Sequence, residues 1–153
     1  KKIKESDYPK ILSFLKKHRI DVFTYHGGND SMDTCAKIAN LCYREGLTTQ
    51  VIGLPKTIDN DLVGTDQCPG FGSAAKYLAT SFNEACLDLT SMSQDSTKVF
   101  ILETMGRHAG WLAASCGLGK HVLDSHLLLV PERSYRLDTL AGQIRECIER
   151  RGL

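Results

Sequence analysis

The chain has 153 residues, about the size of one medium domain, and its 19 basic and 18 acidic residues leave a formal charge of +1. This balance lacks the basic excess that argues for nucleic acid as a main partner. The longest apolar stretches, such as residues 127–130, are far too short to span a bilayer, so we expect no membrane partner. The chain begins at Lys1 without a secretory leader pattern, and we expect it to be an interior piece of a longer cytoplasmic polypeptide.

Six cysteines are spread along the chain, at positions 35, 42, 68, 86, 116 and 147. None forms a C-x-x-C pair, so paired zinc or redox ligands are a poor fit. Most of them lie within apolar helical patterns, which predicts reduced, buried thiols.

Segments with helical apolar spacing alternate with short β-favouring runs. In the first half of the chain we predict a helix from Tyr8 to Leu15, a strand at 20–25, a helix at 35–42, a strand at 48–54 and a polar loop at 55–70. In the second half we predict a long helix at 75–92, a strand at 99–102, a turn at 105–110 opening a helix around Trp111, a strand at 127–130 and a helix at 140–148. This alternation predicts an α/β fold, a Rossmann-like parallel sheet with crossover helices.

In such sheets, ligands bind beyond the carboxyl ends of the strands. The corresponding positions here are residues 26–31, 55–61, 103–107 and 131–133. All four are polar or contain glycine, so we expect them to converge on one site.

The first of these positions is a glycine-bearing loop, Gly27-Gly28-Asn29-Asp30-Ser31. Glycines let backbone amides approach a phosphate closely, and a helix N-terminus adds a favourable dipole. A tight turn with Asp30 or Ser31 as N-cap is an equally good interpretation of the loop alone.

The second position places Lys56 just before two carboxylates, Asp59 and Asp61. Close carboxylates raise one another's pKa or share a cation, which suits a general base beside a magnesium–phosphate cluster. On composition alone, a solvated Asx-rich turn is somewhat favoured.

The last two positions are residues 103–107 and the Pro131-Glu132 pair. Arg107 follows a glycine at a predicted strand end, where a guanidinium can hold a phosphate through two hydrogen bonds. Glu132 can accept hydrogen bonds from sugar hydroxyls. Taken singly, a surface arginine and a solvated glutamate are the better interpretations.

Taken together, these motifs resemble the phosphofructokinase family. The order matches: a Gly-Gly-x-x-Ser loop, then Thr-Ile-Asp-Asn-Asp at 57–61, a Thr-Asp-x-x-x-Gly-Phe-Gly stretch at 65–72, then Met-Gly-Arg at 105–107 and Pro-Glu. The resemblance implies an incomplete phosphofructokinase fold. Residues 1–70 would form part of the phosphate-donor lobe and residues 71–153 part of the fructose 6-phosphate lobe.

The resemblance also implies roles for single residues. Asp59 matches the base that takes the proton from the 1-hydroxyl of the sugar, and Asp61 matches the neighbouring carboxylate near magnesium. The implied acceptor contacts are Thr57, Ile58, Asp59, Met105, Gly106, Arg107 and Glu132. Lys98 stands where ATP-using members carry an arginine that reaches a neighbouring subunit. A lysine keeps the positive charge of that arginine but lacks its planar guanidinium group. Family members are homo-oligomers, so we expect a dimer or tetramer of an allosteric family.

Two positions bear on the phosphoryl donor. ATP-using members resemble Gly-Gly-Asp-Gly-Ser and Pro-Gly-Thr-Ile-Asp, whereas this chain has Asp30 and Lys56 in place of the fourth loop glycine and the glycine before the threonine. A carboxylate at Asp30 would repel the α-phosphate of ATP, and Lys56 adds positive charge beside the transferred group. Both substitutions resemble the pyrophosphate-dependent branch.

The metal ligands depart from the family pattern at Asn29, which stands where an aspartate usually helps to bind Mg²⁺. An amide is a poorer ligand for a hard cation, so Asp61, waters and the donor, or Asp30, would complete the set with Asn29.

The expected function is therefore phosphoryl transfer from pyrophosphate to fructose 6-phosphate in glycolysis, with Mg²⁺ as cofactor. An ATP-dependent phosphofructokinase with unusual loops is the nearest alternative. A non-catalytic regulatory subunit on the same fold is supported by Asn29. The third alternative is a generic nucleotide-binding module, which leaves the motif at residues 57–61 unexplained.

Overall fold

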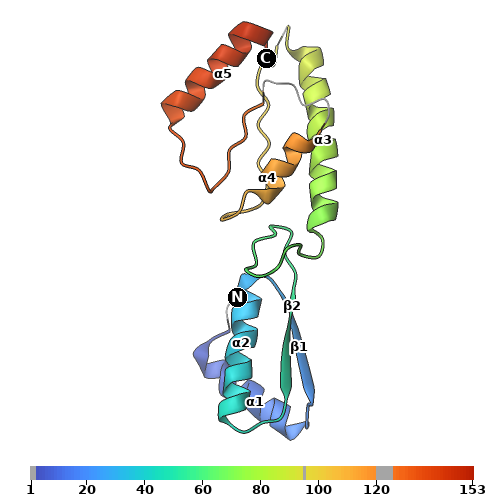
Figure 1. Cartoon of the computed structure of the whole chain (residues 1–153), viewed down its shortest axis with the longest axis vertical. Helices are drawn as coiled ribbons and strands as arrows, with labels where there is room; N and C mark the ends of the chain where they lie inside the picture. The colour runs from blue at the N-terminus through green and yellow to red at the C-terminus, as the bar shows by residue number, and fades with distance from the viewer. Residues whose placement is uncertain (1–2, 95, 120–125) are drawn as a thin grey trace. The chain divides into compact units, whose positions relative to one another are not determined.

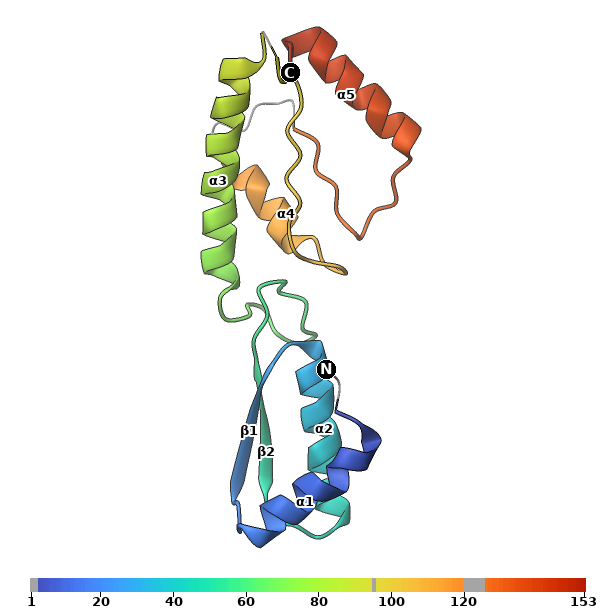
Figure 2. The same ribbon diagram turned by 180° about the vertical axis from the view of Figure 1, so that it is seen from behind.

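The computed structural model describes residues 3–94, 96–119 and 126–153, and the chain divides into two compact units (Figure 1, Figure 2). The first unit extends to Thr57 and includes Leu62–Gly64. The second unit holds Ile58–Asp61 and continues from Thr65 to Leu153. The assignment of residues 1–70 to a donor lobe and 71–153 to an acceptor lobe stays a prediction.

The first unit is a helix–strand–helix–strand arrangement. Its elements are the 3-10 turn η1 (Glu5–Asp7), α1 (Tyr8–Lys17), β1 (Val22–Gly27), α2 (Asn29–Arg44) and β2 (Gln50–Pro55). The two strands are parallel and in register from Val22 opposite Gln50 to Gly27 opposite Pro55. Because α2 connects them, the unit is the β–α–β crossover that the sequence predicts.

The core of the first unit lies between its helices and the sheet. Tyr8 and Leu15 of α1 meet Ile38 and Cys42 of α2, and each of the four is at most 5% exposed. Phe23 is among the strand side chains that pack against this cluster. The helical spacing read from Tyr8 to Leu15 and from Cys35 to Cys42 is thereby confirmed as the buried face of each helix.

The second unit is mainly helical. Its elements are α3 (Phe71–Met92), α4 (Trp111–Ser115), the 3-10 turn η2 (Cys116–Leu118) and α5 (Leu137–Arg151). The helix α3 packs against α4 and η2, and Leu89, Leu112 and Cys116 are buried. Phe71 and Trp111 meet edge to face with ring centroids 6.4 Å apart.

Two predicted strands are absent from the described chain. Residues 99–102 and 127–130 are assigned no regular structure, and their side chains remain largely exposed, with Ile101 83% exposed. A strand exists only where a neighbour completes its hydrogen-bonded ladder, whereas β-favouring composition reports fit to a half-buried pleated surface. Both strand predictions are therefore wrong for the described residues, where neither run has a partner strand.

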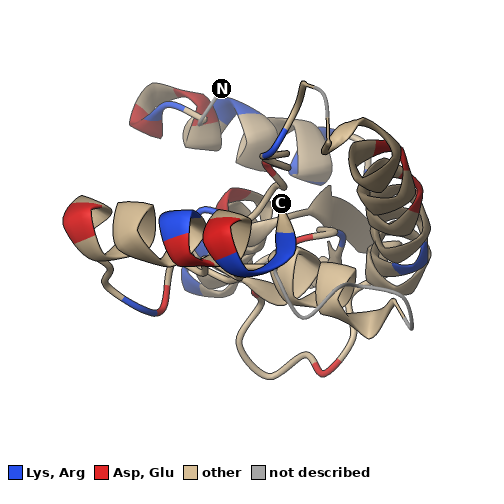
Figure 3. Ribbon diagram, turned by 90° about the horizontal axis from the view of Figure 1, so that it is seen from above, with Lys and Arg blue, Asp and Glu red and all other residues tan. Residues whose placement is uncertain are grey.

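An open apolar cavity of about 250 Å³ lies beside these runs in the second unit. Phe82 of α3 and Ile144 of α5 are among its lining residues, together with residues 98–102 and 127–129. The helix α5 has no buried residue, and charges of both signs are distributed along it (Figure 3). Part of the apolar surface of this unit is therefore left without packing partners among the described residues.

All six cysteines are free thiols, and Cys35, Cys42, Cys68 and Cys116 are buried. The burial of these four thiols agrees with the prediction, whereas Cys86 and Cys147 are half-buried. Across residues 3–94, 96–119 and 126–153, no helix combines the length and apolar character needed to cross a bilayer.

Candidate functional site

The glycine loop follows β1 directly and begins α2. A Cβ placed on Gly27 would lie 2.7 Å from the Cβ of Ser31, closer than real side chains approach, so only glycine fits between strand and helix. Gly28 is the N-cap of α2, and its carbonyl accepts the amides of Ser31 and Met32, both at 3.0 Å. The predicted turn and helix N-terminus are thus both present, with neither Asp30 nor Ser31 as the N-cap.

Lys56 and Thr57 lie next to this loop, at the end of β2. The Lys56 amide donates to the Gly27 carbonyl at 2.8 Å, one step beyond the last strand pair. A Cβ on Gly28 would be 3.9 Å from both the Lys56 carbonyl oxygen and the Thr57 Cβ. The glycine loop and the first residues of the second predicted position, up to Thr57, therefore meet at the carboxyl edge of the two-stranded sheet.

The carboxylates Asp59 and Asp61 flank Asn60, which lies in the second unit. Both aspartates are half-buried, whereas Asn60 is only 8% exposed. The Asn60 side chain donates to the Asp66 carbonyl at 3.2 Å and accepts the Cys68 amide at 2.8 Å. The carboxylate loop is therefore held together through its central asparagine, a role that no local sequence pattern predicts.

The Met105–Arg107 turn depends on Gly106. This glycine has φ +124°, and a Cβ there would collide with the Ala109 carbonyl oxygen. An alanine could adopt the turn only with strain, because both the left-handed backbone and the close carbonyl exclude a side chain. Met105 and Arg107 on either side of the glycine are exposed.

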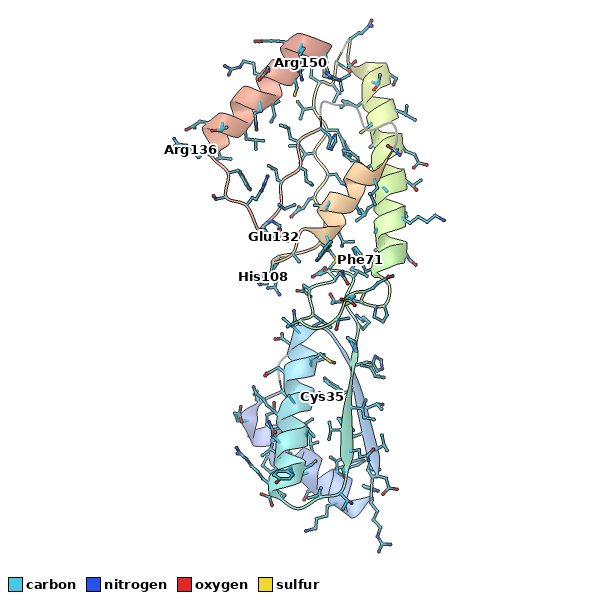
Figure 4. The ribbon with its side chains drawn as sticks, viewed as in Figure 1. Cys35, Phe71, His108, Glu132, Arg136 and Arg150 are labelled. Atoms are coloured by element: carbon cyan, nitrogen blue, oxygen red, sulfur yellow. The ribbon has the colours of Figure 1, made fainter. Side chains whose placement is uncertain are left out.

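Glu132 is joined to the end of the same turn. Glu132 is labelled in Figure 4. Its Oε1 accepts the amide of Gly110, the residue before α4, at 2.8 Å. A Cβ on Gly110 would lie 2.6 Å from the Val130 Cβ, so the glycine permits this approach. The fourth predicted position is thus joined, within the second unit, to the end of the turn predicted at 105–110. Gly110 was missed because a contact across 22 residues leaves no local sequence signal.

Lys98 is half-buried, and its ammonium donates to the Gln94 carbonyl at 3.5 Å. It lines the apolar cavity with residues 99–102. Its expected contact with a sugar phosphate stays a prediction.

Each unit therefore holds part of the predicted set. The first unit joins the glycine loop to Lys56 and Thr57, and the second joins the 105–110 turn to Glu132 and carries Asp59 and Asp61. The convergence of all four positions on one site stays a prediction.

Comparison with known proteins gives a consistent family signal. A family model described as phosphofructokinase matches residues 1–152. The chain is 50% identical over 147 residues to a pyrophosphate--fructose 6-phosphate 1-phosphotransferase of Xanthomonas campestris, covering 95% of the chain and 35% of the relative. It is 42% identical to a sulfofructose kinase of Alkalicoccus urumqiensis, covering 92% of the chain and 37% of that relative.

A crystal structure of a pyrophosphate-dependent phosphofructokinase from Marinobacter aquaeolei is also similar. It superposes with a TM-score of 0.84 at 46% identity, covering 95% of the chain and 38% of that structure. The chain thus spans about a third of the length of the curated relatives it matches.

Proposed function

Because the chain belongs to the phosphofructokinase family, we propose that the protein containing it transfers a phosphoryl group from pyrophosphate to the 1-hydroxyl of fructose 6-phosphate. The products are fructose 1,6-bisphosphate and phosphate. The observation that carries this proposal is the joint edge of β1 and β2, where the Lys56 amide donates to the Gly27 carbonyl at 2.8 Å. At that edge the N-terminus of α2 lies next to Lys56, and a binding site for a phosphate donor needs both the helix N-terminus and the positive charge.

The donor is recognised by amides and charge. The first turn of α2 points N–H groups and the positive end of its dipole toward an anion. Lys56 is exposed and adds a full positive charge at the same edge. Asp30 lies in the first turn of α2 and disfavours a further phosphate at that end, which argues for pyrophosphate over ATP.

Transfer proceeds by in-line displacement. The sugar 1-oxygen forms a bond to the near phosphorus as the bridging P–O bond breaks, and its proton passes to the Asp59 carboxylate. The second phosphate leaves with the bridging electrons. Positively charged groups such as Lys56 stabilise charge that spreads over the phosphoryl oxygens in the transition state.

Mg²⁺ fits this arrangement as an ion carried mainly by the donor. Within the described ranges, no three His, Cys, Asp or Glu side chains form a group able to hold a metal. Mg²⁺ in phosphoryl-transfer sites uses one or two carboxylates plus substrate phosphates. Asp61 would be the protein carboxylate in the second unit, and Asn29 and Asp30 are the candidates in the first. When bound, the ion supplies charge neutralisation at the phosphates.

The acceptor side of the proposal uses the second unit. Arg107 is exposed after a turn held by Gly106, and a guanidinium there is suited to the 6-phosphate. One Glu132 oxygen holds the Gly110 amide at 2.8 Å, which orients the carboxylate and fits a positioned sugar contact. Thr57, Ile58, Met105 and Lys98 complete the proposed acceptor set, and we place the enzyme in the cytoplasm as a homo-oligomer.

The test is a donor comparison on the full-length protein at matched Mg²⁺, with fructose 6-phosphate as acceptor. Pyrophosphate should support turnover and ATP should not. Asp59→Asn should keep the fold and lose about 10²- to 10⁴-fold in kcat, because a general base contributes that much. Near-normal turnover in Asp59→Asn would remove Asp59 from its role.

A second acceptor follows from one relative. The 42% identical protein named a sulfofructose kinase makes sulfofructose the alternative to fructose 6-phosphate. Comparing kcat/KM for the two acceptors decides between them. Preference for ATP in the same assays would contradict the proposed effects of Asp30 and Lys56.

A further inference from the structure

The asparagine between the two carboxylates has an unusual backbone. Asn60 has φ +54°, and among the described non-glycine residues only Arg19 shares a positive φ, at +50°. Asparagine is one of the few side chains that adopt the left-handed region without large strain. The conformation of the central residue sets how the peptide planes carrying Asp59 and Asp61 are turned relative to each other.

Both ends of the Asn60 amide are engaged. Its Nδ2 donates to the Asp66 carbonyl at 3.2 Å, and its Oδ1 accepts the Cys68 amide at 2.8 Å. The two bonds join Asn60 to residues six and eight positions further along the chain. Cys68 is 0% exposed, so the second bond anchors the loop to a fully buried point.

No other side chain reproduces this arrangement. Aspartate lacks the donor for the Asp66 carbonyl and adds a third negative charge between Asp59 and Asp61. Glutamine is one methylene longer, and glycine keeps the backbone while deleting both bonds. A buried amide with both groups paired stabilises a single conformation, and removing it leaves the Cys68 amide unpaired.

We infer that Asn60 is the positioning residue of the carboxylate loop: its amide clamp holds Asp59 and Asp61 in the geometry that proton acceptance and metal binding require. This inference rests on the proposed function. Asn60 acts through its neighbours and does not itself contact substrate.

The test compares Asn60→Gly with Arg19→Gly in the full-length protein. Each change replaces a left-handed non-glycine residue by glycine, so the backbone conformation stays accessible in both. Arg19 is exposed and lies outside the proposed site, so its variant should match the wild type. In Asn60→Gly we expect kcat to fall about 10- to 100-fold, because displacing a reacting group by about 1 Å can cost that much.

Three further readouts separate positioning from mere folding. The Mg²⁺ concentration for half-maximal activity should rise several-fold, as should the rate at which iodoacetamide labels Cys68, read by peptide mass spectrometry. The KM for fructose 6-phosphate should change less than kcat, since the proposed acceptor contacts Arg107 and Glu132 are not part of the clamp. Asn60→Asp, which keeps size and acceptor, should also lose kcat.

Unchanged kcat and unchanged Mg²⁺ dependence in Asn60→Gly would overturn the inference. So would a loss of activity that disappears when rates are expressed per folded molecule, because that is the signature of a purely structural residue. Failure of the proposed function is distinct: the wild type would then transfer nothing from pyrophosphate. Even if the wild type is inactive with pyrophosphate, Cys68 labelling still tests the clamp: an unchanged labelling rate in Asn60→Gly would show that the Asn60 side chain does not hold the loop.

Discussion

Replacing Gly106 by alanine should destabilise the Met105–Arg107 turn by about 3 kcal/mol. The backbone at φ +124° is strained for any L-residue, which costs about 1–3 kcal/mol. The added Cβ would collide with the Ala109 carbonyl oxygen, and overpacking of this kind costs a further 1–3 kcal/mol or so. Reduced freedom of the unfolded chain returns only about 0.4–1 kcal/mol.

Gly142 provides the matched control for this change. It lies inside α5, and a Cβ there would meet nothing within 4 Å. Gly142→Ala should therefore stabilise the protein by roughly 0.5–1 kcal/mol, since alanine is the better helix former. The two glycine-to-alanine changes are expected to have opposite signs.

The assay is urea unfolding of both full-length variants, with amide hydrogen exchange read at residues 105–110. Gly106→Ala should lower the unfolding midpoint or, if the strain is relieved locally, speed exchange in the turn. The KM for the phosphorylated acceptor should rise because Arg107 is no longer held. A Gly106→Ala protein with unchanged midpoint, exchange and KM would refute the argument from φ and the Ala109 carbonyl.

Two further predictions concern the core of the first unit. Ile38→Ala should cost about 2–5 kcal/mol in unfolding free energy, because Ile38 is 1% exposed and its removal leaves a cavity, whereas Ile38→Val should cost only about 0.5–1.5; equal denaturant midpoints for the two variants would contradict this packing. Burial raises the pKa of the Cys42 thiol above its ordinary value of 9.0, so the folded state favours the neutral thiol. The stabilisation of the folded state by the neutral thiol should be complete below pH 9 and lost as the pH rises further. Cys42→Ala should therefore reduce the fall of the urea midpoint at alkaline pH. Parallel curves of urea midpoint against pH for Cys42→Ala and the wild type would contradict this contribution of Cys42.

Local patterns predicted the elements that depend on local physics. The bounds of α1, β1 and β2 lie within about two residues of those predicted, because an amphipathic face is encoded in consecutive residues. The helix α2 was predicted in the right place, but it begins at Asn29, six residues before the predicted start at 35. The helix α3 begins at Phe71, four residues before the predicted start at 75, since Gly70 at φ +89° ends the preceding loop.

Long-range partners were beyond the reach of the same patterns. Residues 99–102 and 127–130 have strand composition, but pairing depends on a neighbour that composition does not specify. The bond between Glu132 and Gly110 and the clamp from Asn60 to Cys68 likewise join residues whose spacing follows no helical or strand period. The candidate residues themselves were identified by motif order, and their geometry required the structure.

The hydrogen bond from the Lys56 amide to the Gly27 carbonyl also limits how this region can change by insertion or deletion. One residue added within β2 would shift every later residue to the opposite side of the strand and remove Lys56 from its place beside Gly27. The turn at Gly46 lies outside both strands, and a Cβ there would meet nothing within 4 Å, so a length change at Gly46 would leave the pairing of β1 with β2 in register. Over evolutionary time, Asp30 and Lys56, to which we attribute the proposed donor preference, are therefore free to change by substitution, while the number of residues in each strand stays fixed.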